Sequence, residues 1–268
     1  MPRWQAGGAA ICLGLISLGL GHASQAAGVQ SAQEIVDGVA QLFSSKSSVA
    51  TVDMQISNTD FQRRITMQFW SVGKSKILVR IRQPPEDAGT AILKVGSKTW
   101  IYLPKANRTV EMQDSMMTTP WMGSDFTLND LVNQTRLTDD YTIATAFEGF
   151  RLMVAVSEYT LTPKPAATVI WGKISMEVRQ DNLMPIWQRY FDDGGNLVRE
   201  LSFSEYKYVS GRLVPTRLVM RPQEQPVAQG RDQRPVDQVV KQTTITYEDI
   251  VFDQPIGDDT FSLKNLKQ

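Results

Sequence analysis

Pairs of neighbouring aspartates are the residues of this sequence that could share acid–base chemistry. They are Asp139-Asp140, Asp192-Asp193 and Asp258-Asp259, and each pair adjoins a glycine or a threonine. An acid–base pair requires two carboxylates whose environments push their pKa values apart. Adjacent aspartates in turn-like sequence more often form turns or cap helices. We therefore interpret these pairs as turn formers and expect no carboxylate catalysis.

Ser124, in the stretch "MGSDF", is the other candidate for chemistry, as a nucleophile. It lacks the G-x-S-x-G spacing of a nucleophile turn. The single cysteine, Cys12, and the single histidine, His22, both lie near the N-terminus. If that region is removed, no thiol, no imidazole base and no Cys- or His-ligated zinc site remains. We expect Ser124 or Asp125 to be the N-cap of a short helix instead, and we predict no catalytic residue, no metal site and no cofactor.

The N-terminal region has the pattern of a secretion signal. Arg3 is followed by an apolar run from Ala9 to Leu20, and Ser24-Gln25-Ala26 places small residues at a cleavage site. No later apolar run reaches the roughly 18 residues of a membrane span. We expect residues 1–26 to be a cleaved signal peptide and 27–268 to be a single domain. The alternative is an uncleaved N-terminal anchor.

The charge balance argues against a nucleic-acid partner. The chain holds 28 Lys and Arg residues and 28 Asp and Glu residues, with no long run of one sign. Strong nucleic-acid binding requires a basic field. We therefore expect no nucleic acid among the partners.

The apolar residues repeat with two different periods. Ser31 and Glu34 form a capping-box pattern, and Ile35, Val39 and Leu42 follow at helical spacing. From Val49 onward the period is two, which predicts about ten to twelve strands in one curved antiparallel sheet. The stretch "FRLMVAVSEYTLTP" is interpreted as one strand, residues 192–196 as a hairpin turn, 127–134 as a short helix and 222–238 as a loop.

Some of these strands carry apolar residues on both faces. In "LVRELSF", Leu197, Leu201 and Phe203 lie on one face and Val198 on the other. A sheet with one solvated face shows cleaner alternation. Either helices cover the second face or that face lines an apolar interior.

A cluster of methionines and a tryptophan lies in a connecting segment, where apolar bulk is usually scarce. It consists of Met112, Met116, Met117, Trp121 and Met122. Methionine is flexible and polarizable and suits sites that fit variable apolar ligands. The segment is either a loop that packs on the core or a pliable lid over an apolar cavity.

Two stretches resemble a known family. "PPEDAGTAILKVGSKTWIYLPKANRTVEM" and "MGSDFTLNDL" resemble the outer-membrane lipoprotein-sorting proteins, the LolA-like periplasmic carriers, in the branch associated with RND- or MMPL-type transporters. The resemblance implies a mainly β protein: an unclosed antiparallel β-barrel, with an N-terminal helix and short helices that cover an apolar cavity. It also implies a monomer that binds lipid or lipoprotein acyl chains in the periplasm and works with an inner-membrane transporter.

The expected site follows from the cluster and the resemblance together. We expect the cavity and its lid to include Met112, Met116, Met117, Trp121, Met122, Phe126, Leu131, Ile35, Val39 and Leu42. The resemblance further implies an arginine on a strand that holds the lid closed, for which Arg63, Arg64, Arg80 and Arg82 are the candidates.

Three functional hypotheses follow. The leading one is a periplasmic carrier that moves acyl chains between an inner-membrane transporter and the outer membrane without catalysing a reaction. The second is a lipid-sensing regulatory module that binds a membrane partner. A carboxylate-dependent hydrolase is the third.

Overall fold

The alternating apolar residues form strands because successive side chains of a strand point to opposite faces of a sheet. In β1 (Ser47–Ser57), Val52, Met54 and Ile56 are buried on one face. The computed structural model describes residues 30–132, 137–165, 167, 169–223 and 241–268. The predicted signal peptide and most of the predicted 222–238 loop lie outside these residues.

Thirteen strands form among the described residues, one more than the ten to twelve predicted, and twelve of them follow β1. They are β2 (Gln62–Val72), β3 (Lys76–Gln83), β4 (Ala91–Val95), β5 (Lys98–Leu103), β6 (Arg108–Glu111), β7 (Tyr141–Arg151), β8 (Val154–Pro163), β9 (Lys173–Arg179), β10 (Pro185–Phe191), β11 (Leu197–Val209), β12 (Arg212–Pro222) and β13 (Gln242–Phe252). The helices are α1 (Ala32–Ala40), α2 (Asp114–Met117), α3 (Leu128–Val132), α4 (Leu137–Asp140) and α5 (Leu263–Leu266), with short 3-10 turns η1 (Pro104–Ala106) and η2 (Asp258–Phe261).

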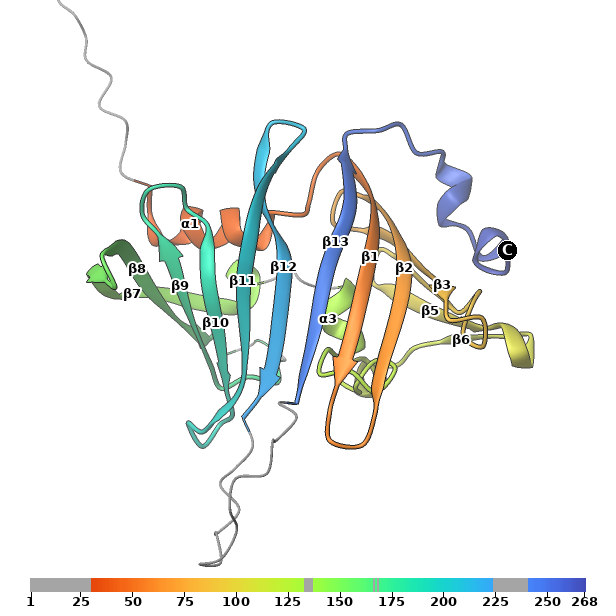
Figure 1. Cartoon of the computed structure of the whole chain (residues 1–268), viewed down its shortest axis with the longest axis horizontal. Helices are drawn as coiled ribbons and strands as arrows, with labels where there is room; N and C mark the ends of the chain where they lie inside the picture. Colours follow the sequence, from red (N-terminus) through yellow and green to blue (C-terminus); the bar gives the residue numbers. More distant parts are fainter. Residues whose placement is uncertain (1–29, 133–136, 166, 168, 224–240) are drawn as a thin grey trace, which may run out of the picture. The chain divides into compact units, whose positions relative to one another are not determined.

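One antiparallel sheet contains all thirteen strands of the described residues (Figure 1). Its order is β6-β5-β4-β3-β2-β1-β13-β12-β11-β10-β9-β8-β7. β6 and β7 stand at the two ends of this order and do not pair with each other, so the sheet is not closed into a barrel. The prediction of an unclosed antiparallel sheet is confirmed.

Two hairpin turns can be compared with the predictions made from local sequence. The turn between β10 and β11 forms as predicted, because the Asp192 carboxylate accepts hydrogen bonds from the backbone and side chain of Asn196. The single strand predicted for "FRLMVAVSEYTLTP" is wrong. The chain reverses at Leu152 and Met153, where β7 ends and β8 begins.

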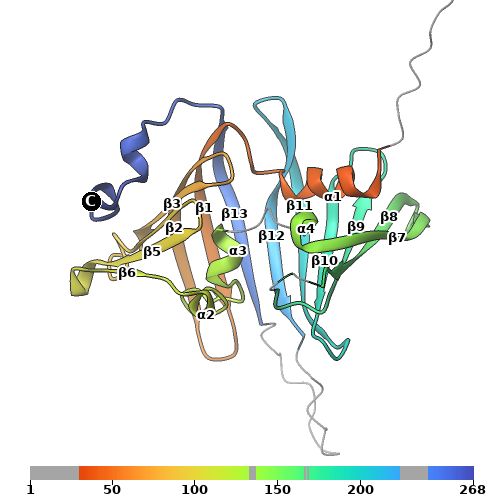
Figure 2. The same cartoon turned by 180° about the vertical axis from the view of Figure 1, so that it is seen from behind.

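The inner face of the sheet carries the main hydrophobic core. Helix α1 begins with the predicted capping box between Ser31 and Glu34, and its Val36 and Val39 pack into this core. Trp121 and Phe126, from the connection between β6 and α3, pack into the same core. Figure 2 shows α1 to α4 in front of this face of the sheet.

The C-terminal segment explains why β3 and β4 are apolar on both faces. Phe261 and Leu266 form a second buried cluster with Leu78 and Leu93, and η2 and α5 contact β3 and β4. Val79 and Ile92, which neighbour those strand residues in sequence, face the main core. Helical turns therefore cover the outer face of this part of the sheet.

Residues Ser31–Gln268 group into one compact unit by their contacts. Among the described residues, no helix has both the length and the apolar character needed to cross a membrane.

Candidate functional site

A cavity of about 730 Å³ lies against the inner face of strands β9 to β12. Its other walls come from α1, from α2 to α4, and from the connection between β8 and β9, which contributes Val169, Ile170 and Trp171. The lining is mixed: apolar side chains predominate, and Asp130, Asp140, Gln188, Tyr141 and Tyr190 add polar groups.

Strand periodicity places the apolar lining. Leu201 and Phe203 of β11 are two residues apart, as are Leu218 and Met220 of β12, and all four line the cavity. Residues at this spacing share one face of a strand. The register between β11 and β12 pairs Leu201 with Met220 and Phe203 with Leu218, which brings the four side chains together.

A second, smaller cavity of about 90 Å³ lies under α3, against β1, β2 and β13. Leu131 and Val132 of α3 line it together with Val52, Phe69 and Ile245. This side of the inner face is therefore nearly filled by packed side chains.

We call residues 114–132, which include α2 and α3, the cover segment. The N-cap of α3 is Thr127: its hydroxyl accepts from the Asp130 backbone N–H at 3.2 Å, and the Asp130 carboxylate accepts from the Thr127 N–H at 2.7 Å. The expectation that Ser124 or Asp125 caps this helix is wrong. The Ser124 hydroxyl accepts from the Phe126 N–H inside the preceding turn instead.

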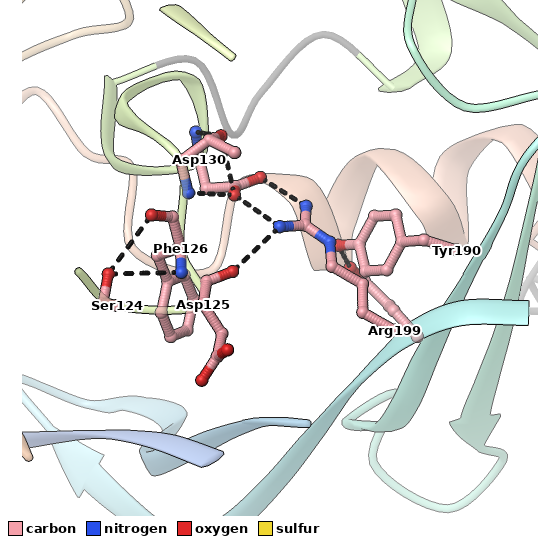
Figure 3. A network of polar contacts seen from close by, with 8 residues as sticks. Ser124, Asp125, Phe126, Asp130, Tyr190 and Arg199 are labelled. Carbon is pink, nitrogen blue, oxygen red and sulfur yellow. Dashed lines mark hydrogen bonds and ion pairs between the residues drawn. The ribbon is translucent and has the colours of Figure 1, made fainter. Parts of the chain in front are cut away.

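Arg199 of β11 holds the cover segment through Asp130 (Figure 3). Its two terminal nitrogens donate to the two carboxylate oxygens of Asp130 at 2.8 and 2.7 Å, and one of them also donates to the Asp125 carbonyl at 3.2 Å. The Arg199 and Asp130 side chains are 6% and 18% exposed. A bidentate pair of this kind combines charge with a fixed geometry.

Aromatic rings surround the Arg199 guanidinium. Trp171 and Tyr190 each have ring centroids 4.5 Å from its central carbon. Burial acts to lower the pKa of Arg199, but the hydrogen bonds and charge of Asp130 outweigh burial and leave the pKa raised. Arg199 therefore stays a cation in a largely apolar setting.

The two cavity tyrosines stay neutral at ordinary pH. Burial, and then the charge of Asp140, raises the pKa of Tyr141 to about 12. Burial also raises the pKa of Tyr190, whose hydroxyl donates to Gln188 at 2.8 Å. Tyr141 donates its own proton to the Trp171 carbonyl at 3.4 Å, so each hydroxyl keeps an oxygen lone pair that can accept a hydrogen bond from a bound molecule.

Three further contacts tie the cover segment to the sheet. Arg63 of β2 donates to the Met122 carbonyl at 3.4 Å, and Lys94 of β4 donates to the Val132 carbonyl at 2.9 Å. Thr243 of β13 donates to the Asp125 carboxylate at 2.7 Å. Four separate strands thus position this segment.

Only one of the four predicted arginines contacts the cover segment. This is Arg63, which lies on the inner face and also pairs with Asp87. The other three have partners outside the cover segment. Arg64 pairs with Asp53, Arg80 donates to the Asn265 carbonyl and Arg82 donates to Gln68.

Arg199 was not among the predicted arginines. A signal for it exists, because Arg199 falls at the same alternating positions as Leu197, Leu201 and Phe203 in "LVRELSF". A charged residue at an inward position of a strand requires a partner.

The predicted cavity residues fall into two groups. Val39, Leu42, Met117 and Phe126 line the larger cavity and Leu131 lines the smaller one. Ile35, Met112, Met116, Trp121 and Met122 line neither of these two cavities. Met116 is 40% exposed, whereas Trp121 is 6% exposed and belongs to the main core.

The aspartate pairs lie in turns or at element ends, as interpreted from the sequence. Asp258 pairs with Lys76 at 2.7 Å, and Asp140 ends α4 beside the cavity. Within the part of the chain that the structure describes, no group of His, Cys, Asp and Glu residues is arranged to hold a metal ion.

Comparisons with known structures agree on the fold. An outer membrane lipoprotein-sorting protein domain from Vibrio parahaemolyticus matches with a TM-score of 0.73 and 20% identity, over 88% of this chain and 98% of that one. A DUF1329 family protein from Desulfovibrio piger matches with a TM-score of 0.75 and 20% identity, over 88% and 97%. A LolA superfamily protein from Nitrosomonas europaea matches with a TM-score of 0.71 and 18% identity, over 88% and 100%.

The chain has a LolA-like fold, an unclosed antiparallel sheet with helices on its inner face. A family model with the description "Uncharacterized protein" matches residues 73–268, and the chain belongs to that family. No curated protein matches the sequence.

Proposed function

We propose that this protein is a periplasmic carrier that binds the acyl chains of a lipid or a lipoprotein in its inner cavity. The observation that carries the proposal is the cavity of about 730 Å³, lined mainly by apolar side chains and bordered by a cover segment that Arg199 holds. This volume falls within the range of about 300–1,000 Å³ that is typical of ligand sites.

Shielding an acyl chain from water contributes a large free energy. Each CH₂ group removed from water contributes about 0.8 kcal/mol, so a chain of about sixteen carbons represents on the order of 12 kcal/mol. A polar surface cannot offset this exposure. Leu201, Phe203, Leu218 and Met220 present apolar surface on which such a chain can lie.

The Arg199–Asp130 pair is the proposed latch of the carrier. Asp130 is on the short helix α3 and Arg199 is on a strand of the sheet, so their separation removes the bidentate contact between the cover segment and β11. Cargo that enters the cavity can then displace Phe126 and Met117, which line it from the cover side. Binding and release require no bond to be made or broken in the cargo.

The partner proteins of the carrier are part of the same proposal. Lipoprotein sorting in the name of the Vibrio parahaemolyticus protein supports lipid-anchored cargo. An inner-membrane RND- or MMPL-type transporter as donor, the outer membrane as acceptor and a monomeric state remain predictions. The predicted cleavage after Ala26 would release the carrier into the periplasm.

The test combines identification of bound lipid with a cavity-filling variant. Protein purified from the periplasmic fraction, with its N-terminus sequenced, is extracted and analysed by mass spectrometry for acyl-chain lipids. Delipidated protein is then titrated with a fluorescent palmitate analogue. Leu201→Trp places a bulky side chain in the cavity and should weaken probe binding by roughly tenfold or more.

The matched control is Tyr208→Trp, because Tyr208 is 77% exposed on the same strand and lies outside the cavity lining. Its probe affinity should equal that of the parent. Absence of copurified lipid, together with equal probe affinity for Leu201→Trp and the parent, would contradict the carrier proposal. A stable complex with an inner-membrane receptor and no lipid transfer would favour the regulatory module.

A further inference from the structure

The hairpin that joins β7 and β8 ends in exposed apolar side chains. Leu152 is 99% exposed, Met153 is 94% exposed and Phe150 is 77% exposed. Single exposed apolar residues are ordinary on protein surfaces, but three within four positions at one tip are a candidate interaction site. We call residues 150–153 the hairpin tip.

The backbone of the turn makes the choice of residues more unusual. Leu152 has a φ of 47° and Met153 a φ of 66°. Two-residue hairpin turns with positive φ at both central positions strongly favour Asn-Gly or Asp-Gly. Leucine and methionine are disfavoured in this region because the Cβ atom crowds the backbone. Turn geometry therefore does not account for either residue.

The hairpin tip presents no free charge. Between Gly149 and Ala155, Arg151 is the one charged residue of the sequence. Its guanidinium is held back along the sheet by Glu158 at 2.6 Å and by Glu177, and it lies 4.4 Å from the centre of the Phe147 ring. The tip can thus enter an apolar phase without carrying an uncompensated charge with it.

We propose that the hairpin tip inserts into the interfacial region of a lipid bilayer. A bilayer accepts side chains on a protruding turn without a complementary pocket, and binding strength follows the buried apolar area. A specific protein partner would bury about 800 Å² on each side. Three side chains on a two-residue turn offer less than this, so the geometry favours a membrane surface over a protein partner.

This inference does not depend on the cargo. Phe150, Leu152 and Met153 are absent from the lining of both cavities described above, so a variant of the hairpin tip leaves those linings unchanged. Membrane contact would bring the protein to the surface of a donor or acceptor membrane whatever it carries.

The decisive variant replaces the tip with the residues that the turn prefers. Leu152→Asn combined with Met153→Gly removes the apolar side chains and supplies an Asn-Gly turn, so the melting temperature should stay equal or rise. Purified protein is floated with vesicles of phosphatidylethanolamine and phosphatidylglycerol, and separately with vesicles of phosphatidylcholine. The parent should bind both kinds, and the variant should lose roughly tenfold or more in partitioning.

Tyr208→Asn is the matched control, since Tyr208 is 77% exposed near a different hairpin turn, between β11 and β12. It should bind vesicles as the parent does. In a second measurement, vesicles are added to the Leu152→Trp variant. The fluorescence emission of the new tryptophan should then shift to the blue, and brominated lipids in the vesicles should quench it. The proposal is overturned if the parent does not bind vesicles, if the Asn-Gly variant binds as well as the parent, or if the new tryptophan is not quenched.

Discussion

The two halves of the inner face differ in what lies opposite the sheet. On β2, Ile65 and Met67 are 0% exposed and face a nearly filled core with a residual cavity of about 90 Å³. On β11, Leu201 and Phe203 are 7% and 9% exposed and face a cavity of about 730 Å³. Similar burial therefore hides two different environments: packed side chains in the first half and open volume in the second.

The cover segment explains the difference. Its contacts to β2, β4 and β13 place Trp121, Leu131 and Val132 against the first half, where they fill the space above the sheet. Above the second half, α1, α4 and the connection between β8 and β9 form walls but do not fill the space. Arg199 stands at the boundary, and its pair with Asp130 is the link between the two regions.

The largest loss of stability is expected for a substitution in the packed half of the inner face. Trp121→Ala should lower the free energy of unfolding by about 3–5 kcal/mol, because a buried tryptophan leaves a cavity when it is truncated. Probe affinity per folded molecule should be unchanged, since Trp121 lines neither of the two cavities. Urea unfolding and probe titration on one preparation measure both quantities. Met116→Ala, in the same segment and 40% exposed, is the control and should stay within about 0.5 kcal/mol.

A small loss of stability in Trp121→Ala together with weaker probe binding would make Trp121 part of a lid over the cargo. In that event the boundary between the packed half and the cavity half would have to be moved.

The next largest loss of stability is expected at the boundary between the two halves, at the Arg199–Asp130 pair. Asp130→Ala leaves Arg199 buried without its carboxylate, which should cost about 3 kcal/mol, at the lower end of the range for buried pairs because Asp130 is 18% exposed. Hydrogen exchange should rise in residues 118–132, and probe association should become faster. Lys98→Ala breaks the pair with Glu111, in which the side chains are 62% and 52% exposed, and should change stability by about 0–1 kcal/mol. Equal effects of the two variants would show that the Arg199–Asp130 pair is not a latch.

The smallest effect is expected for Ser124. Ser124→Ala removes a hydroxyl that accepts from the Phe126 N–H at 3.2 Å within a turn, so the free energy of unfolding should fall by about 1 kcal/mol. Probe binding should persist, because the hydroxyl acts within the turn of the cover segment. Complete loss of function at an unchanged melting temperature would instead indicate that Ser124 takes part in a reaction.

Much of the fold could be predicted because its signals are local. Alternation with period two predicted the strands, and the capping box of Ser31 and Glu34 predicted the start of α1. The β7–β8 turn was missed for the same reason, since Leu152 and Met153 carry no local preference for positive φ. Sequence patterns report backbone preferences, and this turn opposes them.

The candidate site could be predicted only in outline. It follows from the sequence alone that apolar bulk gathers in residues 112–122 and that a charge, Arg199, falls at an inward position of a strand. Only the folded chain shows that Trp121 fills the core, that Met116 is exposed and that Arg199 pairs with Asp130, 69 residues earlier. It also shows that the C-terminal turns cover the outer face of β3 and β4. These features escape sequence patterns because periodicity determines which residues share a face, whereas strand order and register determine what lies opposite that face.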